Sequence, residues 1–224
     1  MFDFSNFHIG LTNRCRLSCP ACARTNIETK LSDKIFDMDP TVYRTALLRW
    51  NPKEILFCGN YGDPIYAAGF LELIKSLKEN NPLMKIKIST NGTGKTTEWW
   101  HELMSYLNFN DIVTFAVDGL PTNFMKYRVN AKWSDLENAV RACTSFVKPN
   151  GEERAFIKWK YIIFKYNEND IVQAWDLSKK LGVDAGYFSR ILSNTYVPSE
   201  ERMKVIVNYF SNISEDEKAL LMNY

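Results

Sequence analysis

The sequence predicts an α/β protein in which six parallel strands form a partial TIM barrel, a (β/α)6 fold. Candidate strands and helices alternate along the chain, which implies a parallel sheet with right-handed crossovers. The 224 residues suit one domain of six such units, because a full barrel of eight units needs about 250 residues. Several strands also alternate polar and apolar residues, unlike the unbroken apolar runs of strands buried on both faces. We therefore expect an open barrel with a polar interior.

Strands are expected where short apolar runs end in turn residues. The first run leads into a loop rich in cysteine, and the third and fourth end in Asn91-Gly92 and Asp118-Gly119. The six predicted strands cover residues 4–11, 54–59, 85–90, 111–117, 156–164 and 184–190.

Helices are expected between start and stop signals. Asp39 is a typical N-cap and Pro40 a typical first helical residue, while Asn81-Pro82 and Gly182 are typical stops. The predicted helices cover residues 40–50, 69–80, 97–107, 133–147, 168–181, 199–210 and 214–222. We expect a single domain over residues 1–224, with C-terminal helices from about 198–224 after the last strand.

The strands show which face meets the helices. In the fifth predicted strand Ile157, Trp159 and Tyr161 share one face, and Lys158 and Lys160 share the other. The apolar face must contact the helix layer, so the polar face lines the barrel. This pattern predicts a charged cavity, although a single strand with such a pattern could instead be an edge with a solvated face.

Composition excludes several classes of protein. The formal net charge is +2, which does not favour binding to nucleic acid or to an anionic membrane. The chain shows neither a signal peptide nor an apolar run long enough to cross a bilayer. Three of its five cysteines lie in one loop, which argues against a disulfide framework. We expect a cytoplasmic protein.

The loop contains Cys15, Cys19 and Cys22, spaced C-x3-C-x2-C. Thiolates are soft ligands for zinc, copper(I) or iron–sulfur clusters. Structural zinc sites usually combine two ligand pairs, but Cys58 and Cys143 are isolated and are interpreted as core thiols. Three thiolates leave a metal position open for another ligand, which indicates catalysis. A partial zinc site, three reduced surface cysteines, or a zinc-binding module that recognises a partner are the alternatives.

The loop Asn13–Cys22 resembles the signature of the radical S-adenosylmethionine (SAM) enzymes. The resemblance implies that Cys15, Cys19 and Cys22 hold three irons of a [4Fe–4S] cluster, while the amino and carboxylate groups of SAM chelate the fourth. It also implies reductive cleavage of SAM to methionine and a 5′-deoxyadenosyl radical, which abstracts hydrogen from a substrate. The core of this family is a six-unit partial barrel, in agreement with the strand pattern.

Two positions depart from the family pattern. Tyr61-Gly62-Asp63-Pro64 stands where the family usually has Gly-Gly-Glu-Pro, which binds the amino group of SAM. The resemblance therefore assigns Tyr61, Gly62 and Asp63 to the methionine part of SAM. Ala21 stands where the family often has an aromatic residue near the adenine.

Four more residues are candidates for contact with SAM. Ser89 and Asn91 follow the third strand and resemble family residues near the methionine carboxylate and ribose, although Asn91-Gly92 also suits an ordinary turn. Asp118 could bind a ribose hydroxyl or the substrate, or cap the following loop. Arg128 could pair with the SAM carboxylate, or be a solvated surface arginine.

The substrate is less defined. Lys158 and Lys160 predict either an anionic substrate group in the cavity or an internal partner such as Glu54. The pattern is nearest to the branch with molybdenum-cofactor and peptide-maturating enzymes, but no cysteine follows Cys143, so we expect no auxiliary cluster. We expect a small-molecule or peptide substrate and a reductant such as flavodoxin or ferredoxin; a nucleotide-like substrate is the alternative. The sequence identifies no catalytic side chain.

Overall fold

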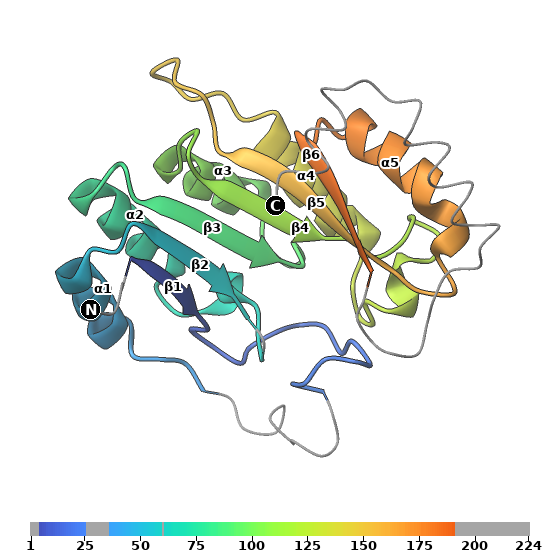
Figure 1. The fold of residues 1–224 in the computed structure, drawn as a ribbon, viewed down its shortest axis with the longest axis horizontal. Helices are drawn as coiled ribbons and strands as arrows, with labels where there is room; N and C mark the ends of the chain where they lie inside the picture. The colour runs from blue at the N-terminus through green and yellow to red at the C-terminus, as the bar shows by residue number, and fades with distance from the viewer. Residues whose placement is uncertain (1–4, 26–35, 60, 191–224) are drawn as a thin grey trace.

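The computed structural model describes residues 5–25, 36–59 and 61–190. Six strands form one parallel sheet in which their order in space follows their order in the chain (Figure 1). Among the described residues, β1 and β6 each pair on one side only, so the barrel is open. The strands are β1 (Asn6–Ile9), β2 (Glu54–Cys58), β3 (Lys85–Thr90), β4 (Ile112–Ala116), β5 (Phe156–Ile163) and β6 (Ala185–Arg190).

Helices connect successive strands, which confirms the predicted α/β alternation. The helices are α1 (Pro40–Trp50), α2 (Phe70–Asn80), α3 (Thr97–Tyr106), α4 (Trp133–Thr144) and α5 (Ile171–Lys180). Short 3-10 turns are η2 (Pro64–Tyr66), η3 (Phe124–Lys126) and η4 (Glu168–Asp170). The helix predicted over 168–181 thus begins with η4 and becomes α-helical at Ile171. The helices predicted over 199–210 and 214–222 lie outside the described residues.

Local chemistry determines where α1 begins and ends. The Asp39 carboxylate accepts a hydrogen bond from the Thr41 amide at 2.8 Å, as predicted for an N-cap. Asn51 ends the helix in a left-handed conformation, with φ of 44°. The Asp39 N-cap contributes about 1 kcal/mol, and Asn51 marks the point at which the chain turns toward β2. In the described part of the chain, none of the helices is sufficiently long and apolar to cross a membrane.

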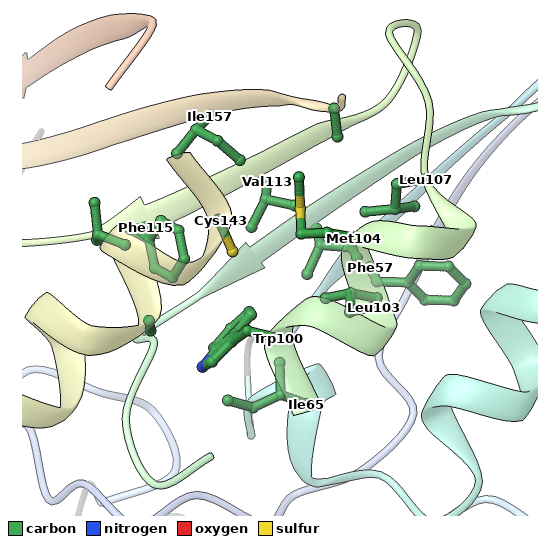
Figure 2. Close-up of a cluster of buried hydrophobic side chains, with 14 of the residues drawn as sticks. Phe57, Ile65, Trp100, Leu103, Met104, Leu107, Val113, Phe115, Cys143 and Ile157 are labelled. Carbon is green, nitrogen blue, oxygen red and sulfur yellow. The ribbon is translucent and has the colours of Figure 1, made fainter. Parts of the chain in front are cut away.

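One face of the sheet carries the core that joins it to the helices. Figure 2 shows Phe57, Val113, Phe115 and Ile157 from the strands around Trp100 of α3. Burying each such side chain contributes about 1.5–3 kcal/mol. This confirms the predicted apolar face. The buried strand residues are Ile55, Phe57, Ile86, Ile88, Val113, Phe115, Ile157, Trp159 and Tyr161.

The opposite face of the sheet is charged. Glu54 of β2 lies beside Lys85 in the β2–β3 register. Its carboxylate is 2.6 Å from Lys87 Nζ and 4.0 Å from Lys85 Nζ. The internal carboxylate therefore pairs with the lysines of β3. The predicted polar interior is present, and the solvated-edge alternative applies to β1, where His8 is exposed.

Candidate functional site

A cavity of about 360 Å³ lies where the carboxyl ends of the strands meet the cysteine loop. Ligands of parallel α/β barrels bind at this end of the strands. Cys15, Cys19 and Cys22 all line the cavity, and residues that follow β2, β3 and β4 form its wall with β5. Its volume is that of a small-molecule site. The structure thus brings the three clustered cysteines to one space.

Hydrogen bonds close the cysteine loop on itself. Arg24 donates from Nε to the Asn13 carbonyl at 2.8 Å and from Nη1 to the Leu17 carbonyl at 2.9 Å. The Cys22 amide donates to the Cys19 carbonyl at 3.0 Å. Because these bonds use backbone carbonyls, they fix the path of the loop. Sequence reasoning missed Arg24, although an arginine two residues after the third cysteine is a visible signal.

Two of the thiols have donors directed at their sulfur atoms. Cys15 Sγ accepts from the Leu17 amide and from Asn91 Nδ2, each at 3.4 Å. Cys19 Sγ is 3.8 Å from Arg128 Nη1. Hydrogen bonds and positive charge stabilise a thiolate or a metal-bound sulfur. The wall of the cavity is therefore built to hold sulfur ligands with negative charge.

Burial keeps these thiols protonated when no metal is bound. Burial raises the pKa of Cys15 to about 11, and the nearby Asp63 carboxylate adds to the effect. Burial also raises the pKa of Cys19, while Arg128 opposes the shift. Soft metals bind the thiolate, so metal binding at these residues must release protons.

The chemistry of the donor set fits an iron–sulfur cluster, in which each thiolate binds a different iron. Cys15, Cys19 and Cys22 line one cavity, and N–H donors lie beside two of their sulfur atoms. These three residues could therefore hold three irons of a cluster.

Asp63 is a buried centre of hydrogen bonds. Its carboxylate accepts from the Ile65 amide, the Thr90 hydroxyl and both the amide and side chain of Asn91. Desolvation raises its pKa to about 6, although these bonds oppose the shift. The carboxylate has little capacity left for a ligand. Asp63 therefore ties the loop after β2 to the end of β3.

Gly62 is needed for contact between two loops. A Cβ at this position would stand 2.2 Å from the Thr12 carbonyl oxygen, in the backbone just before the cysteines. Its missing side chain thus gives room to the cysteine loop. Gly62 also lines the main cavity, and its contact with a ligand stays a prediction. Tyr61 is 46% exposed and lines a separate cavity with His8. The structure does not bring Tyr61 to the main cavity.

Ser89 and Asn91 both reach the cavity wall. Ser89 lies opposite Cys58 in the β2–β3 register, and both residues line the cavity. Asn91 uses its amide group on Asp63 and Cys15, and its carbonyl oxygen accepts from Thr93. Asn91 is therefore a positioning residue for a thiol. The interpretation of Cys58 as a core thiol was wrong, because it is half-buried and lines the cavity.

Asp118 and Arg128 form a buried ion pair with 2.6 Å between Oδ2 and Nη2. Asp118 also accepts from the Ile162 amide at 2.9 Å and does not line the cavity. Arg128 does line it, and its side chain is only 14% exposed, so the surface-arginine alternative was wrong. Arg128 Nε is buried and has no hydrogen-bond partner within the described ranges.

The two lysines of β5 are separated by the structure. Lys160 lines the cavity. Lys158 does not, and its ammonium lies 5.8 Å from the Phe156 ring. Burial lowers the pKa of Lys158, and the charges of Lys85 and Lys87 add to this effect. Only one of the two predicted substrate residues therefore faces the cysteines.

The family model of the radical SAM superfamily matches residues 9–170, well over half of the chain. No curated protein matches the chain in sequence. The matched span contains the cysteine loop and every residue described above as lining the cavity.

Several solved structures share this fold. SuiB from Streptococcus suis, bound to the precursor peptide SuiA, has a TM-score of 0.70 at 12% identity, over 92% of this chain and 46% of SuiB. The structure of anSMEcpe, with bound AdoMet and the Kp18Cys peptide, has a TM-score of 0.61 at 17% identity, over 88% of this chain and 54% of anSMEcpe. TsrM from Kitasatospora setae is a radical SAM methyltransferase with cobalamin and a [4Fe–4S] cluster bound. Its TM-score is 0.57 at 12% identity, over 82% of this chain and 36% of TsrM. This chain spans about half or less of their length.

Proposed function

The chain belongs to the radical SAM superfamily, and on that premise we propose that it is a radical SAM enzyme. When bound, a [4Fe–4S] cluster supplies one electron to SAM, whose cleavage gives methionine and a 5′-deoxyadenosyl radical that abstracts hydrogen from a substrate. The protein provides binding, orientation and electrostatics. The observation that carries the proposal is the convergence of Cys15, Cys19 and Cys22 on one cavity with N–H donors beside two of the sulfurs.

In this proposal the three cysteines hold the cluster. Asn91 and Arg128 direct donors at Cys15 and Cys19, which stabilises the negative charge of the ligated sulfurs. Arg128 lines the cavity, which supports a contact between its guanidinium and the carboxylate of SAM. The remaining lining residues proposed to contact SAM are Gly62, Asp63 and Ser89, of which Asp63 acts mainly through Asn91.

The substrate is proposed to be a small molecule or a peptide segment. The cavity at the strand ends, about 360 Å³ in volume, supports the binding of small ligands. The structural relatives SuiB and anSMEcpe were each solved with a peptide. We propose a cytoplasmic enzyme with a one-electron donor such as flavodoxin or ferredoxin, and one catalytic domain over residues 1–224.

The proposal is tested with the full chain reconstituted without oxygen. We expect about four irons and four sulfides per chain. After reduction with dithionite in the presence of SAM, we expect 5′-deoxyadenosine. Replacing Cys15, Cys19 or Cys22 by Ala should remove the iron and the product together.

Cys143→Ala is the matched control. Cys143 is fully buried in the core between the sheet and the helices (Figure 2) and does not line the cavity. Its replacement should leave the iron and sulfide content unchanged. Wild-type protein that binds zinc without sulfide, or a Cys143→Ala protein that loses iron, would contradict the proposal.

A further inference from the structure

The two lysines on the inner face of β5 have different surroundings. Lys158 lies near other cations, since the positive charges of Lys85 and Lys87 add to the lowering of its pKa. Lys160 is two residues nearer the carboxyl end of β5 and lies opposite Ala116 in the β4–β5 register. Its side chain is half-buried in the wall of the cavity. The strand thus places Lys160 in the cavity wall and Lys158 outside the cavity lining, toward the amino end of β5.

Lys160 has no ion-pair partner within the described ranges. Glu54 pairs with the lysines of β3. The Asp118 carboxylate pairs with Arg128. Asp63, the single acid that lines the cavity in this part of the chain, already accepts several hydrogen bonds. Every carboxylate near the cavity is therefore occupied by another group.

The other cations of the cavity are also occupied. Arg24 donates to two carbonyls of the cysteine loop, and the charge of Arg128 is balanced by Asp118. Lys160 differs because its ammonium has no acceptor among the residues that the structure describes. A partly buried ammonium is costly unless it is paired or solvated. The cavity therefore has an unmatched positive charge at this point.

Lys160 lies across the barrel interior from Cys58. β2 and β5 are separated by two strands in the sheet, yet Cys58 and Lys160 line the same cavity. The charge of Lys160 opposes the larger effect of burial, which raises the pKa of the Cys58 thiol. Lys160 therefore faces the interior of the open barrel, in the same cavity as the cysteine loop.

We infer that Lys160 binds an anionic group of the substrate, a phosphate or a carboxylate, and that Lys158 does not. This inference rests on the proposed function and names the chemical class of its substrate. Lysine binds such groups as a point charge with three donors, so it does not require one geometry. The anion would be held at the β5 wall while the rest of the substrate extends toward the cysteine loop.

The test measures anion binding directly. The probes are inorganic phosphate, followed by ³¹P line broadening, and acetate, followed by saturation-transfer proton NMR. Both are titrated into the full chain with its cluster and saturating SAM, so that the carboxylate of SAM already occupies its own site. We expect at least one anion to bind, and Lys160→Met to weaken it about tenfold or more. The anion that binds more tightly identifies the group.

Lys158→Met is the matched control and should change the affinity less than twofold. Equal loss in both variants, no loss in Lys160→Met, or no binding of either anion to wild type would overturn the inference. Binding that disappears when SAM is added would also overturn it, because Lys160 would then hold SAM. Thermal melts of both variants verify that they are folded.

The two proposals fail in different ways. Wild type should load iron and cleave SAM to 5′-deoxyadenosine after reduction, whether or not it binds an anion at Lys160. If wild type loads no iron, the proposed function fails. The same titrations on metal-free protein then decide the role of Lys160, because they do not depend on the cluster.

Discussion

Two buried carboxylates at the rim of the sheet perform similar tasks with different chemistry. Asp63 follows β2 and is held by uncharged donors only, among them Asn91, which reaches Cys15. Asp118 follows β4 and pairs with a cation, Arg128. Each carboxylate therefore positions a donor beside one of the thiols.

The difference lies in how each negative charge is compensated. Around Asp63 hydrogen-bond dipoles offset part of the desolvation, the charge of Arg128 adds a smaller effect, and the pKa of the carboxyl still rises to about 6. The negative charge of Asp118 is offset by the full positive charge of Arg128, so the stability of the folded protein depends on keeping both partners. The Asp63 region is accordingly expected to respond to pH, and the Asp118 region to loss of one side chain.

The largest effect is expected for Asp118→Ala. The substitution leaves the Arg128 guanidinium buried without a counter-charge, which should lower the free energy of unfolding by about 3–5 kcal/mol. Urea denaturation of metal-free protein measures the loss. The double variant Asp118→Ala with Arg128→Leu should recover most of it. A double variant as unstable as the single one would show that the charge is not the cause.

A smaller effect concerns pH and Asp63. Its carboxyl binds a proton more tightly in the folded than in the unfolded protein, so between about pH 4 and 6 the folded state carries more protons. The contribution of this group to stability is therefore fully present below about pH 4 and is lost as pH rises to about 6, a change of about 3 kcal/mol. Unfolding curves of wild type and Asp63→Asn across this range isolate the effect. Parallel pH profiles would refute it.

Gly62→Ala tests how the Asp63 region joins the cysteine loop. The added Cβ meets the backbone of Thr12 and Asn13, so we expect a loss of about 1–3 kcal/mol together with reduced iron loading. Gly10→Ala is the control, since its nearest neighbour, the Cys58 carbonyl oxygen, is 3.9 Å from the added Cβ. Full iron loading in Gly62→Ala would mean that the two loops can separate without harm to the thiols.

The smallest effect is a shift in the reduction potential of the bound cluster. Donors near the sulfurs favour the reduced, more negative form. Arg128→Gln removes a charge beside Cys19 and should lower the potential more than Asn91→Ala, which removes a neutral donor from Cys15. Potentiometric titration followed by EPR compares them. An equal or reversed order would remove the distinction between the two regions.

The sequence predicted the strands and the cysteine loop because both depend on neighbours along the chain. The alternation of Ile157, Trp159 and Tyr161 with two lysines needed no tertiary information, since side chains of a strand alternate between faces. The same rule applied to β2 would have placed Cys58 on the inner face with Glu54. The interpretation of Cys58 as a core thiol was wrong because it ignored the two-residue alternation of side chains along β2.

The roles of Asp63, Asp118 and Gly62 were not predictable in this way. Each depends on a partner from another strand or loop: Asn91 for Asp63, Arg128 for Asp118 and the Thr12 carbonyl for Gly62. A motif indicates that such residues belong to a site. It does not tell whether they contact a ligand or the residues that hold it.

By itself, the sequence determined the α/β alternation, the inner face of β5 and the three thiols of the loop, because periodicity and spacing act over a few residues. Only the tertiary structure decided which lysine faces the cavity and which donor reaches each sulfur. Sheet curvature sets how far Lys158 and Lys160 stand from the loop, and crossovers of dozens of residues bring Asn91 and Arg128 to Cys15 and Cys19. These distances result from the packing of the whole sheet against its helices. A short sequence pattern does not predict that packing.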